Sequence, residues 1–306
     1  MPYYLGIDGG AARTVAVLID ENGGVRASGK AGAISFPQYG KEAALSIIAD
    51  LANQMAQGRK IRSLCAGLSG LNRQTDMAGM NSALKVLQLA DHVEVVSEGL
   101  IALYGATIGK PGVILMAGSE VVAWGTDGRN FKRADGWGYF LGDNGGMIDL
   151  SRSALVAAFK SYDGRGKRTR LVEAMLEYFN VNSPEEVLEK VYGKPVPVVA
   201  AFTPYVFREA ILGDEVALDL IRGAAKELGS SVRAVIDSLK LPSPPIFAYG
   251  GLLQNQLLKL EVEKELGVSL LSPKFQPVIG AAIRAVSNAG ELSEEILKNL
   301  SSNTTE

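Results

Sequence analysis

The 306-residue chain has few of the side chains on which several common kinds of site depend. It contains one cysteine, Cys65, and one histidine, His92. A single cysteine excludes an internal disulfide, a cysteine-ligated zinc site and a cysteine-held iron–sulfur cluster within one chain. A single histidine excludes chemistry that needs two imidazoles. We expect Cys65 to be a small buried hydrophobic residue, because it lies inside an apolar run, and His92 to lie in a surface turn.

An excess of charge and a long hydrophobic run are missing as well. The formal net charge is −2, which argues against a nucleic-acid or anionic-membrane partner, because such binding needs clustered positive charge. No apolar run approaches the ~20 residues that span a bilayer, and a glycine-rich loop starts too early to leave room for a signal peptide. Hydrophobic and charged contents of 47% and 21% are those of a globular protein. We therefore expect a cytoplasmic protein with room for two domains.

The N-terminal stretch predicts a hairpin with a glycine-rich turn. An apolar run leads into Asp8-Gly9-Gly10, and a second apolar run begins after Thr14. Two β-rich segments this close together are typical of a hairpin. Glycines let backbone N–H groups approach an anion, and a carboxylate such as Asp8 can hold hydrated Mg²⁺. Arg13 adds a fixed positive charge and Thr14 a hydroxyl donor. A tight hairpin with incidental glycines explains the same residues.

A similar order of signals returns later in the chain. Gly118 follows Gly10 by 108 positions. In both places a strand, a small-residue turn, a second strand, an Asp-Gly or Asn-Gly turn and a third strand follow one another. Two similar β-meanders, facing one another across a cleft that holds the site, are the economical interpretation.

The remaining pattern predicts an alternation of strands and helices. Residues 31–39 read as a loop and residues 301–306 as a frayed tail. Strands are expected over 61–68, 93–96, 246–249 and 268–271. Helices are expected over 41–57, 76–89, 100–108, 147–161, 171–179, 184–192, 196–209, 215–240 and 277–289.

Two further glycine-rich segments indicate unusual backbone geometry or a bound ligand. Residues 136–146 contain five glycines and three aromatic residues. Gly250-Gly251-Leu252 follows the strand expected over 246–249, and a strand–Gly-Gly–helix junction can face a nucleotide.

These motifs, in this order, resemble the actin/hexokinase/Hsp70 superfamily. The Gly-Trp-Gly-x-x-x-Gly-Asp block at 136–143 is most similar to the BadF/BadG/BcrA/BcrD-type ATPase family, which includes N-acetylglucosamine kinases and some archaeal hexokinases. The resemblance implies an α/β fold of two ribonuclease-H-like (actin-like ATPase) domains with a cleft between them. It also implies ATP and Mg²⁺ as cofactors, phosphoryl transfer to a sugar hydroxyl, and a small-molecule sugar as partner, with a homodimer as one possible assembly.

The domains implied by the resemblance are an acceptor-side domain at 1–110 and a nucleotide-side domain at 111–276. The first contains the first phosphate loop and is completed by the helix near 277–300. Asp8 would hold Mg²⁺, and Glu98 takes the position of the catalytic base. The residues implied to contact ATP are Gly9, Gly10, Arg13, Thr14, Gly118, Ser119, Gly250, Gly251 and Leu252. Those implied to contact the acceptor are Ser35, Asn72, Gly136, Trp137 and Asp143.

Several positions depart from the family pattern. Ala11 and Ala12 stand where Gly and Thr are usual, and Glu120 places a carboxylate in the second phosphate loop. Glu98 replaces an aspartate, so its longer side chain displaces the carboxylate by ~1 Å. Ser35 and Asn72 replace the usual Asn and Asp.

Two functions from different classes therefore stay open. One is an ATP-dependent kinase for a sugar or amino sugar, and the other is a non-catalytic nucleotide- or sugar-binding regulatory relative. A third member of the fold, the activating ATPase of 2-hydroxyacyl-CoA dehydratases, needs more than one cysteine per chain, and this chain has only Cys65.

Overall fold

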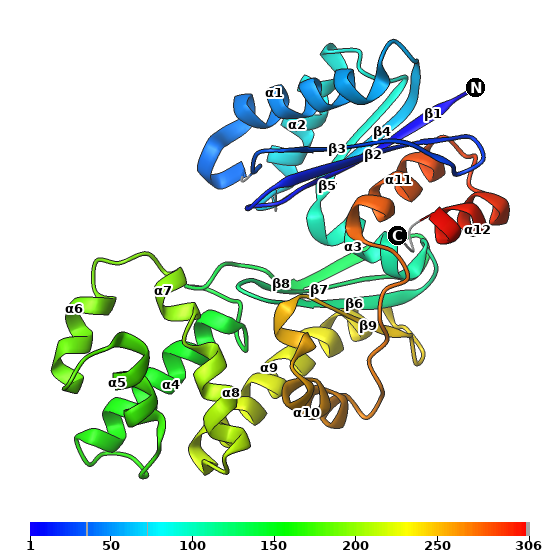
Figure 1. Ribbon diagram of the computed structural model, residues 1–306. Coiled ribbons are helices and arrows are strands. Elements are labelled where there is room, and N and C mark those ends of the chain that lie inside the picture. Colours follow the sequence, from blue (N-terminus) through cyan, green and yellow to red (C-terminus); the bar gives the residue numbers. More distant parts are fainter. Residues whose placement is uncertain (35, 72, 304–306) are drawn as a thin grey trace. The chain divides into compact units, whose positions relative to one another are not determined.

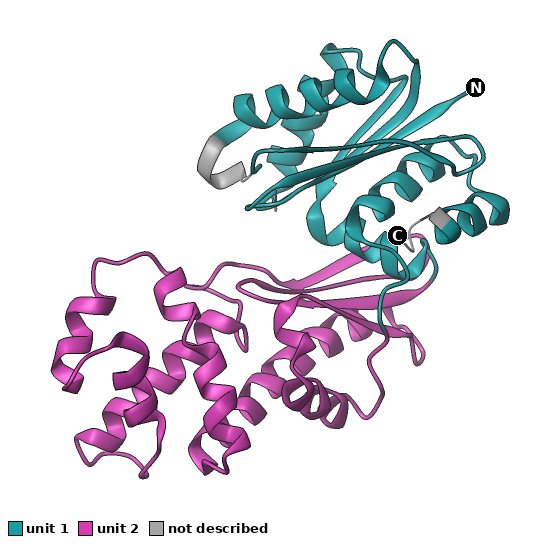
Figure 2. Cartoon of the chain, viewed as in Figure 1, with its two compact units in different colours: residues 1–110, 272–306 teal, residues 111–271 magenta. Residues whose placement is uncertain are grey.

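The computed structural model describes residues 1–34, 36–71 and 73–303. They divide into two compact units, shown in different colours in Figure 2. Unit 1 combines Met1–Lys110 with the chain from Ser272 onward, and unit 2 is Pro111–Leu271. Unit 2 is therefore an insertion between two parts of unit 1. Within the described ranges, no helix is long and apolar enough to cross a membrane.

Unit 1 contains a five-stranded sheet in the order β3-β2-β1-β4-β5. Three strands form the expected antiparallel meander, and two more run parallel to β1. Their bounds are β1 Tyr3–Gly9, β2 Thr14–Asp20, β3 Val25–Ala31, β4 Ile61–Leu68 and β5 His92–Ser97. Because β1, β4 and β5 are parallel, their C-terminal ends share one edge of the sheet. Asp8 and the junction from β5 into the next helix lie on that edge.

Helices cover both faces of this sheet (Figure 1). The bounds are α1 Phe36–Ala56, α2 Gln74–Val86, α3 Glu98–Thr107, α11 Pro277–Asn288 and α12 Glu294–Asn303. Alternate residues of β1 and β2 form a core with α1 and α2. On the other face α11 approaches so closely that a Cβ atom at Gly6 would lie 2.4 Å from the Ala282 nitrogen. Only glycine fits there.

Unit 2 repeats the meander with a smaller sheet, in the order β8-β7-β6-β9. The strands are β6 Gly112–Ala117, β7 Val121–Thr126, β8 Phe131–Asp135 and β9 Ile246–Tyr249, of which β9 runs parallel to β6. The helix α9, Glu215–Leu239, packs on one face of this sheet (Figure 1). The meander predicted from the second set of glycine turns is present, and the predicted α/β class is confirmed.

The rest of unit 2 is mostly helical. Its elements are α4 Met147–Tyr162, α5 Leu171–Phe179, η1 Pro184–Glu186, α6 Val187–Val191, α7 Pro197–Ala200, α8 Thr203–Ile211, η2 Gly251–Gln254 and α10 Gln256–Leu266. One apolar core joins these helices to the inner face of the sheet.

Five sequence expectations need correction. The expected loop at 31–39 contains the start of α1, whose first turn is separated from the rest by a kink at Gly40, with φ of 77°. The helix expected over 184–192 starts as the 3-10 turn η1, and that expected over 196–209 is two helices, α7 and α8. Residues 268–271 form no strand, since only Leu271 makes an isolated bridge, to Phe247. Residues 301–303 of the expected tail belong to α12.

The lone cysteine and the lone histidine lie as expected with respect to solvent. Cys65 is fully buried in β4, and burial raises the pKa of its thiol well above the usual range. His92 is exposed, although it begins β5 rather than lying in a turn.

Candidate functional site

The first glycine turn joins β1 to β2 at the sheet edge. The Gly10 N–H donates to the Arg13 carbonyl at 3.0 Å, and the Gly10 carbonyl accepts from Ile34 N–H at 3.0 Å. These bonds hold the turn from both sides. Ala11, Ala12 and Arg13 are exposed at its tip. A tight turn with exposed backbone and a nearby guanidinium can bind an anion.

Asp8 lies at the base of this turn and is partly buried. Burial raises the pKa of its carboxyl to about 6, and the opposing charge of Arg13 limits the rise. A carboxylate that has lost part of its hydration gains from a bound cation. Among the described residues no cluster of three or more His, Cys, Asp or Glu could hold a metal. A hydrated Mg²⁺ that uses one protein carboxylate together with substrate phosphates is compatible with Asp8 alone.

The hydroxyl of Thr14, predicted to contact ATP, has a partner within the protein. Its side chain is fully buried, and its hydroxyl donates to the Gly32 carbonyl at 2.7 Å. A hydroxyl carries one hydrogen, so in this conformation none is left for a phosphate oxygen. Thr14 therefore fastens the turn to the end of β3, and the exposed tip of the turn presents its backbone and Arg13.

The second glycine turn joins β6 to β7 in unit 2. The Gly118 N–H donates to the Glu120 carbonyl at 3.0 Å, and the Gly118 carbonyl accepts from Met147 N–H at 2.9 Å, at the start of α4. Ser119 and Glu120 are exposed. A methyl group at Gly118 would meet no atom within 4 Å, so the space beside it is open. Partial desolvation raises the pKa of Glu120.

The Gly-Trp-Gly block is fastened to this second turn by two aspartates. Asp135 accepts the N–H groups of Gly136 and Asp143 at 2.8 Å each. Asp143 accepts the Val121 N–H at 3.0 Å. Asp143 is 2% exposed, and burial is the main cause that raises its pKa to about 6, with Asp135 and Glu120 contributing. One carboxylate oxygen of Asp143 therefore holds the start of β7. The side chain of Trp137, in the same block, is exposed.

The Gly250 junction lies against the same turn. Gly250 has φ of 106°, and a Cβ atom there would lie 2.3 Å from the Ala117 carbonyl oxygen. Only glycine lets the end of β9 pack on the end of β6 in this way. Gly251 is exposed, but Leu252 is 3% exposed and belongs to the core. The side chain of Leu252 therefore serves the core, and the predicted contact of this residue with ATP stays a prediction for its backbone.

Glu98 is the first residue of α3 and directly follows β5. The elements on both sides of Glu98 are held by a network of side chains that the sequence did not predict. Arg284 of α11 donates to both carboxylate oxygens of Glu94 at 2.7 Å and also to the Tyr104 hydroxyl. Burial raises the pKa of Glu94, but its bonds to Arg284 and Asn288 outweigh burial and lower it. The β5–α3 junction is thus fixed to α11 by charge as well as by packing.

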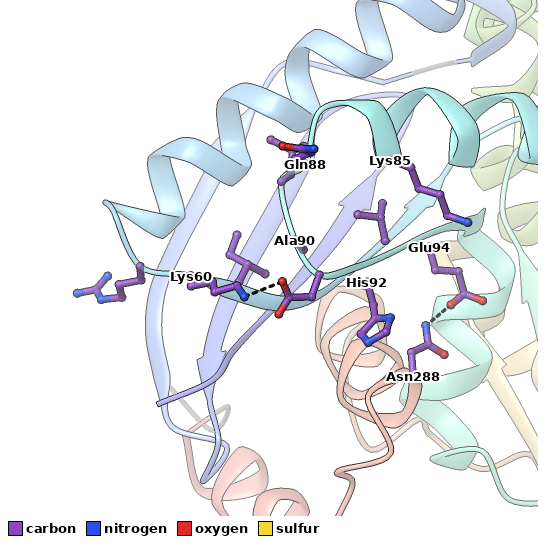
Figure 3. A pocket seen from close by; sticks show the side chains of 12 residues that line it. Lys60, Lys85, Gln88, Ala90, His92, Glu94 and Asn288 are labelled. Atoms are coloured by element: carbon purple, nitrogen blue, oxygen red, sulfur yellow. Dashed lines mark hydrogen bonds and ion pairs between the residues drawn. The ribbon is translucent and has the colours of Figure 1, made fainter.

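Unit 1 also has a cavity of about 960 Å³ at the opposite edge of the sheet (Figure 3). Its charged groups are explained by the fold. Lys60 pairs with Asp91 at 2.9 Å, and Lys85 lies in the last turn of α2, where the helix dipole favours a cation. The cavity lies at the N-terminal ends of β4 and β5, whereas Asp8 lies near the C-terminal end of the seven-residue β1, a strand about 20 Å long. The cavity is therefore separate from the Asp8 turn.

The structure brings the predicted residues together in two groups. Unit 1 holds Asp8, the first turn and Glu98, and unit 2 holds the second turn, the Gly-Trp-Gly block and the Gly250 junction. Ser35 and Asn72 lie outside the described residues. The roles of the other predicted residues stay predictions.

Known proteins are similar to this chain over nearly all of its length. An N-acetylmuramic acid/N-acetylglucosamine kinase from Clostridium acetobutylicum is 28% identical over 94% of this chain and 99% of its own. An N-acetyl-D-glucosamine kinase from Dictyostelium discoideum is 25% identical over 93% and 98%. A solved structure from Chromobacterium violaceum, described as an N-acetylglucosamine kinase, has a TM-score of 0.72 at 23% identity and covers 92% of this chain and 98% of its own.

The family model for the BadF/BadG/BcrA/BcrD ATPases matches residues 5–285. This range includes both meanders, both glycine turns and the Gly-Trp-Gly block, so the family indicated by these motifs is confirmed. The chain belongs to the BadF/BadG/BcrA/BcrD ATPase family.

Proposed function

We propose that this protein transfers a phosphoryl group from ATP to a hydroxyl of an N-acetylated amino sugar. The observation that carries the proposal is the first turn, where a partly desolvated Asp8 carboxyl lies beside Arg13 in a glycine turn with an exposed tip. The sequence similarity to two kinases of such sugars, over more than nine-tenths of the chain, supports the choice of acceptor.

Each part of the proposed site has one task. Asp8 would hold Mg²⁺, which when bound neutralises phosphate charge. Arg13 and the exposed backbone of the first turn would bind phosphate oxygens, and the open space beside Gly118 would admit others. Glu98 would accept the proton of the attacking sugar hydroxyl. Positioning and charge neutralisation account for most of the rate enhancement in this chemistry.

A second candidate is a regulatory relative that binds nucleotide or sugar without turnover. Two observations favour it. The hydroxyl of Thr14 is committed to Gly32. Glu120 is exposed beside Gly118, and its charge opposes a triphosphate.

Calorimetric titration with Mg-ATP, followed by a turnover assay with N-acetylglucosamine and other sugars, separates the two candidates. We expect binding and turnover. Absence of ATP binding in both the unmodified protein and Glu120→Gly would refute the kinase proposal. Binding without turnover of any sugar would support the regulatory candidate.

The proposed base has its own test. Glu98→Gln should reduce kcat by about 10²–10⁴-fold, the usual contribution of general-base catalysis, and should leave ATP affinity unchanged. Glu295→Gln in α12 makes the same charge change at an exposed position of the same unit and should behave as the unmodified protein. An unchanged kcat in Glu98→Gln would show that Glu98 is not the base.

A further inference from the structure

Glu98, the proposed base, lies at a corner where a strand runs directly into a helix. β5 ends at Ser97, and α3 begins at the next residue. Ser97 has an extended backbone, with φ of −71° and ψ of 153°, and its side chain makes no capping bond to α3, although serine commonly does so at this position. Among the described residues its buried hydroxyl has no hydrogen-bond partner. The angle between β5 and α3 therefore depends on contacts made elsewhere along the two elements.

β5 lies at the edge of its sheet, where it pairs with β4, and side chains from two helices add further anchors. At Val95 the Asn81 side chain of α2 donates to the backbone carbonyl at 3.0 Å and accepts the N–H at 2.8 Å, as a neighbouring strand would. The helix α11 packs on β1, β4 and α3. It reaches β5 through Arg284 and Asn288, which both donate to Glu94; Figure 3 shows the bond from Asn288.

Arg284 holds both sides of the corner with one guanidinium. Two of its nitrogens donate to the two carboxylate oxygens of Glu94 at 2.7 Å, and the third donates to the Tyr104 hydroxyl. Glu94 precedes Glu98 in β5, and Tyr104 follows it in α3. The guanidinium carbon also lies 4.8 Å from the centroid of the Tyr104 ring. A planar fork that is bound on both sides resists a change in the angle between the elements that it joins.

The charges of the pair make this connection stronger than one at the surface. The side chains of Arg284 and Glu94 are 18% and 26% exposed, so solvent screens their attraction only in part. Burial alone would raise the pKa of Glu94, but the bonds from Arg284 lower it. Glu94 is therefore charged at neutral pH.

We propose that Arg284 is a positioning residue for the base. By binding Glu94 and Tyr104 together, Arg284 fixes the angle at which α3 leaves β5, and this angle sets the place of the Glu98 carboxylate. The place matters because a misplacement of about 1 Å can cost about a hundredfold in rate. This inference rests on the proposed function.

The packing of α11 on α3 does not need Arg284. A Cβ atom at Gly280 would lie 2.0 Å from the Ile101 carbonyl oxygen, and one at Gly105 would lie 2.7 Å from the Phe275 carbonyl oxygen. These glycines bring the two backbones into direct contact, and close packing of this kind holds the helices together. Because these contacts do not include β5, they leave its angle to α3 to the side chains. We therefore expect variants that alter only the fork to fold.

Two substitutions loosen the corner to different degrees. Arg284→Lys keeps the positive charge but cannot bind Glu94 and Tyr104 as a fork, so it should lower kcat by about 10- to 100-fold. Tyr104→Phe keeps the ring and the ion pair and removes the hydroxyl, so it should lower kcat by about three- to tenfold, the range for one hydrogen bond. The KM for ATP should change by less than about twofold in both, since the loss falls on the chemical step.

Steady-state kinetics with N-acetylglucosamine at saturating Mg-ATP measures these values. Tyr4→Phe is the matched control, because Tyr4 of β1 also loses a hydroxyl bond in the same unit, to the Glu291 carboxylate. It should leave kcat unchanged. Urea denaturation of each variant gives its folded fraction, so that kcat can be expressed per folded molecule.

A background without the base separates positioning from general damage. In Glu98→Gln no carboxylate is left to misplace, so adding Arg284→Lys or Tyr104→Phe should lower the residual kcat by less than about twofold. A loss that arises from the fold would instead multiply with the loss in Glu98→Gln.

Every other outcome counts against the proposal. If the unmodified protein phosphorylates no sugar, or if Glu98→Gln leaves kcat unchanged, the proposed function or its base fails, and the positioning role fails with it. If Glu98→Gln lowers kcat but Arg284→Lys and Tyr104→Phe behave as Tyr4→Phe does, the positioning role alone is refuted. Losses that multiply in the Glu98→Gln background, or that appear as a raised KM for ATP, refute it as well.

Discussion

The two glycine turns occupy equivalent places in two similar meanders, yet their charges differ. In unit 1 the turn has a carboxyl, Asp8, with a cation, Arg13, beside it. In unit 2 the corresponding turn has Glu120, and the buried Asp143 lies against it, with no basic side chain among the causes that shift the pKa of either. The repeat therefore reproduces the backbone but not its electrostatics.

This difference indicates which ions each turn can bind. A turn with charges of both signs can hold a cation and an anion together, as a metal–phosphate complex requires. A turn with carboxylates alone can bind an anion only through its backbone N–H groups. We therefore expect substitutions in the first turn to affect turnover, and substitutions in the second to affect affinity.

Among substitutions that compare the two turns, the largest effect should come from Asp8→Asn. Loss of the carboxylate should lower kcat/KM for ATP by about 10²–10³-fold, the range for removal of one electrostatic contact to the reacting group. Steady-state kinetics at saturating Mg²⁺ measures it. Asp50→Asn, at an exposed position of α1, is the matched control and should change nothing. A loss below tenfold would mean that the first turn does not hold the metal.

Two glycine-to-alanine substitutions compare how closely the backbone is packed in β1, before the first turn, and at the second turn. A methyl group at Gly6 would collide with the backbone of α11, whereas at Gly118 it would meet open space. Gly6→Ala should lower the free energy of unfolding by about 2–3 kcal/mol, as overpacking does, and Gly118→Ala by less than about 0.5 kcal/mol.

Urea denaturation of both variants measures the difference. Gly118→Ala should instead weaken ATP binding, because the methyl group would occupy the space proposed for phosphate. Equal destabilisation by the two substitutions would contradict the comparison.

The two carboxyl pKa values that are raised to about 6 make stability depend on pH. Asp8 and Asp143 both have a folded-state pKa of about 6, above the ordinary value of 3.8. The protonated form thus favours folding, so their contribution is present below pH 4 and is lost as the pH rises through 6. Asp8→Asn and Asp143→Asn should each raise stability at pH 7 relative to pH 4 by on the order of 1 kcal/mol.

Urea unfolding at the two pH values without Mg²⁺ tests this, with Asp50→Asn again as control. If the variants lose more stability than the unmodified protein as the pH rises, the effect has the opposite sign and contradicts this prediction. Added Mg²⁺ should lower the apparent pKa of Asp8 but leave that of Asp143 unchanged.

The smallest effect concerns Glu120. Its side chain reaches solvent, although partial desolvation raises its pKa, so water screens part of its charge. Glu120→Gln should lower the KM for ATP by about two- to fivefold, the range of a surface charge interaction, with kcat unchanged. A higher KM would show that Glu120 helps to hold the nucleotide, for example through a shared cation.

The sequence predicted those parts of the fold that local chemistry determines. Turns rich in glycine and aspartate mark both meanders, and apolar spacing marks α5 and α9. The predictions failed where the local structure depends on residues that are distant in the sequence. Leu271 is extended like a strand residue but finds only one bridge, to Phe247.

The site shows the same division. The glycine turns and the Asp8 position follow from motifs, but the burial of Thr14 and Leu252 does not, because it depends on what packs around them. The ion pair between Arg284 and Glu94 joins residues 190 positions apart. No local pattern could have revealed it.

The insertion of unit 2 into unit 1 has a consequence for synthesis on the ribosome. The helix α11, which covers one face of β1, emerges only after all of unit 2. Until then the backbone groove at Gly6 has nothing to close it, whereas unit 2 already has its complete chain. Because domains generally fold as units during synthesis, we expect unit 2, the later segment, to mature first. Until the last tenth of the chain is made, α3 alone covers that face of the sheet, and β1 lacks the cover that α11 provides.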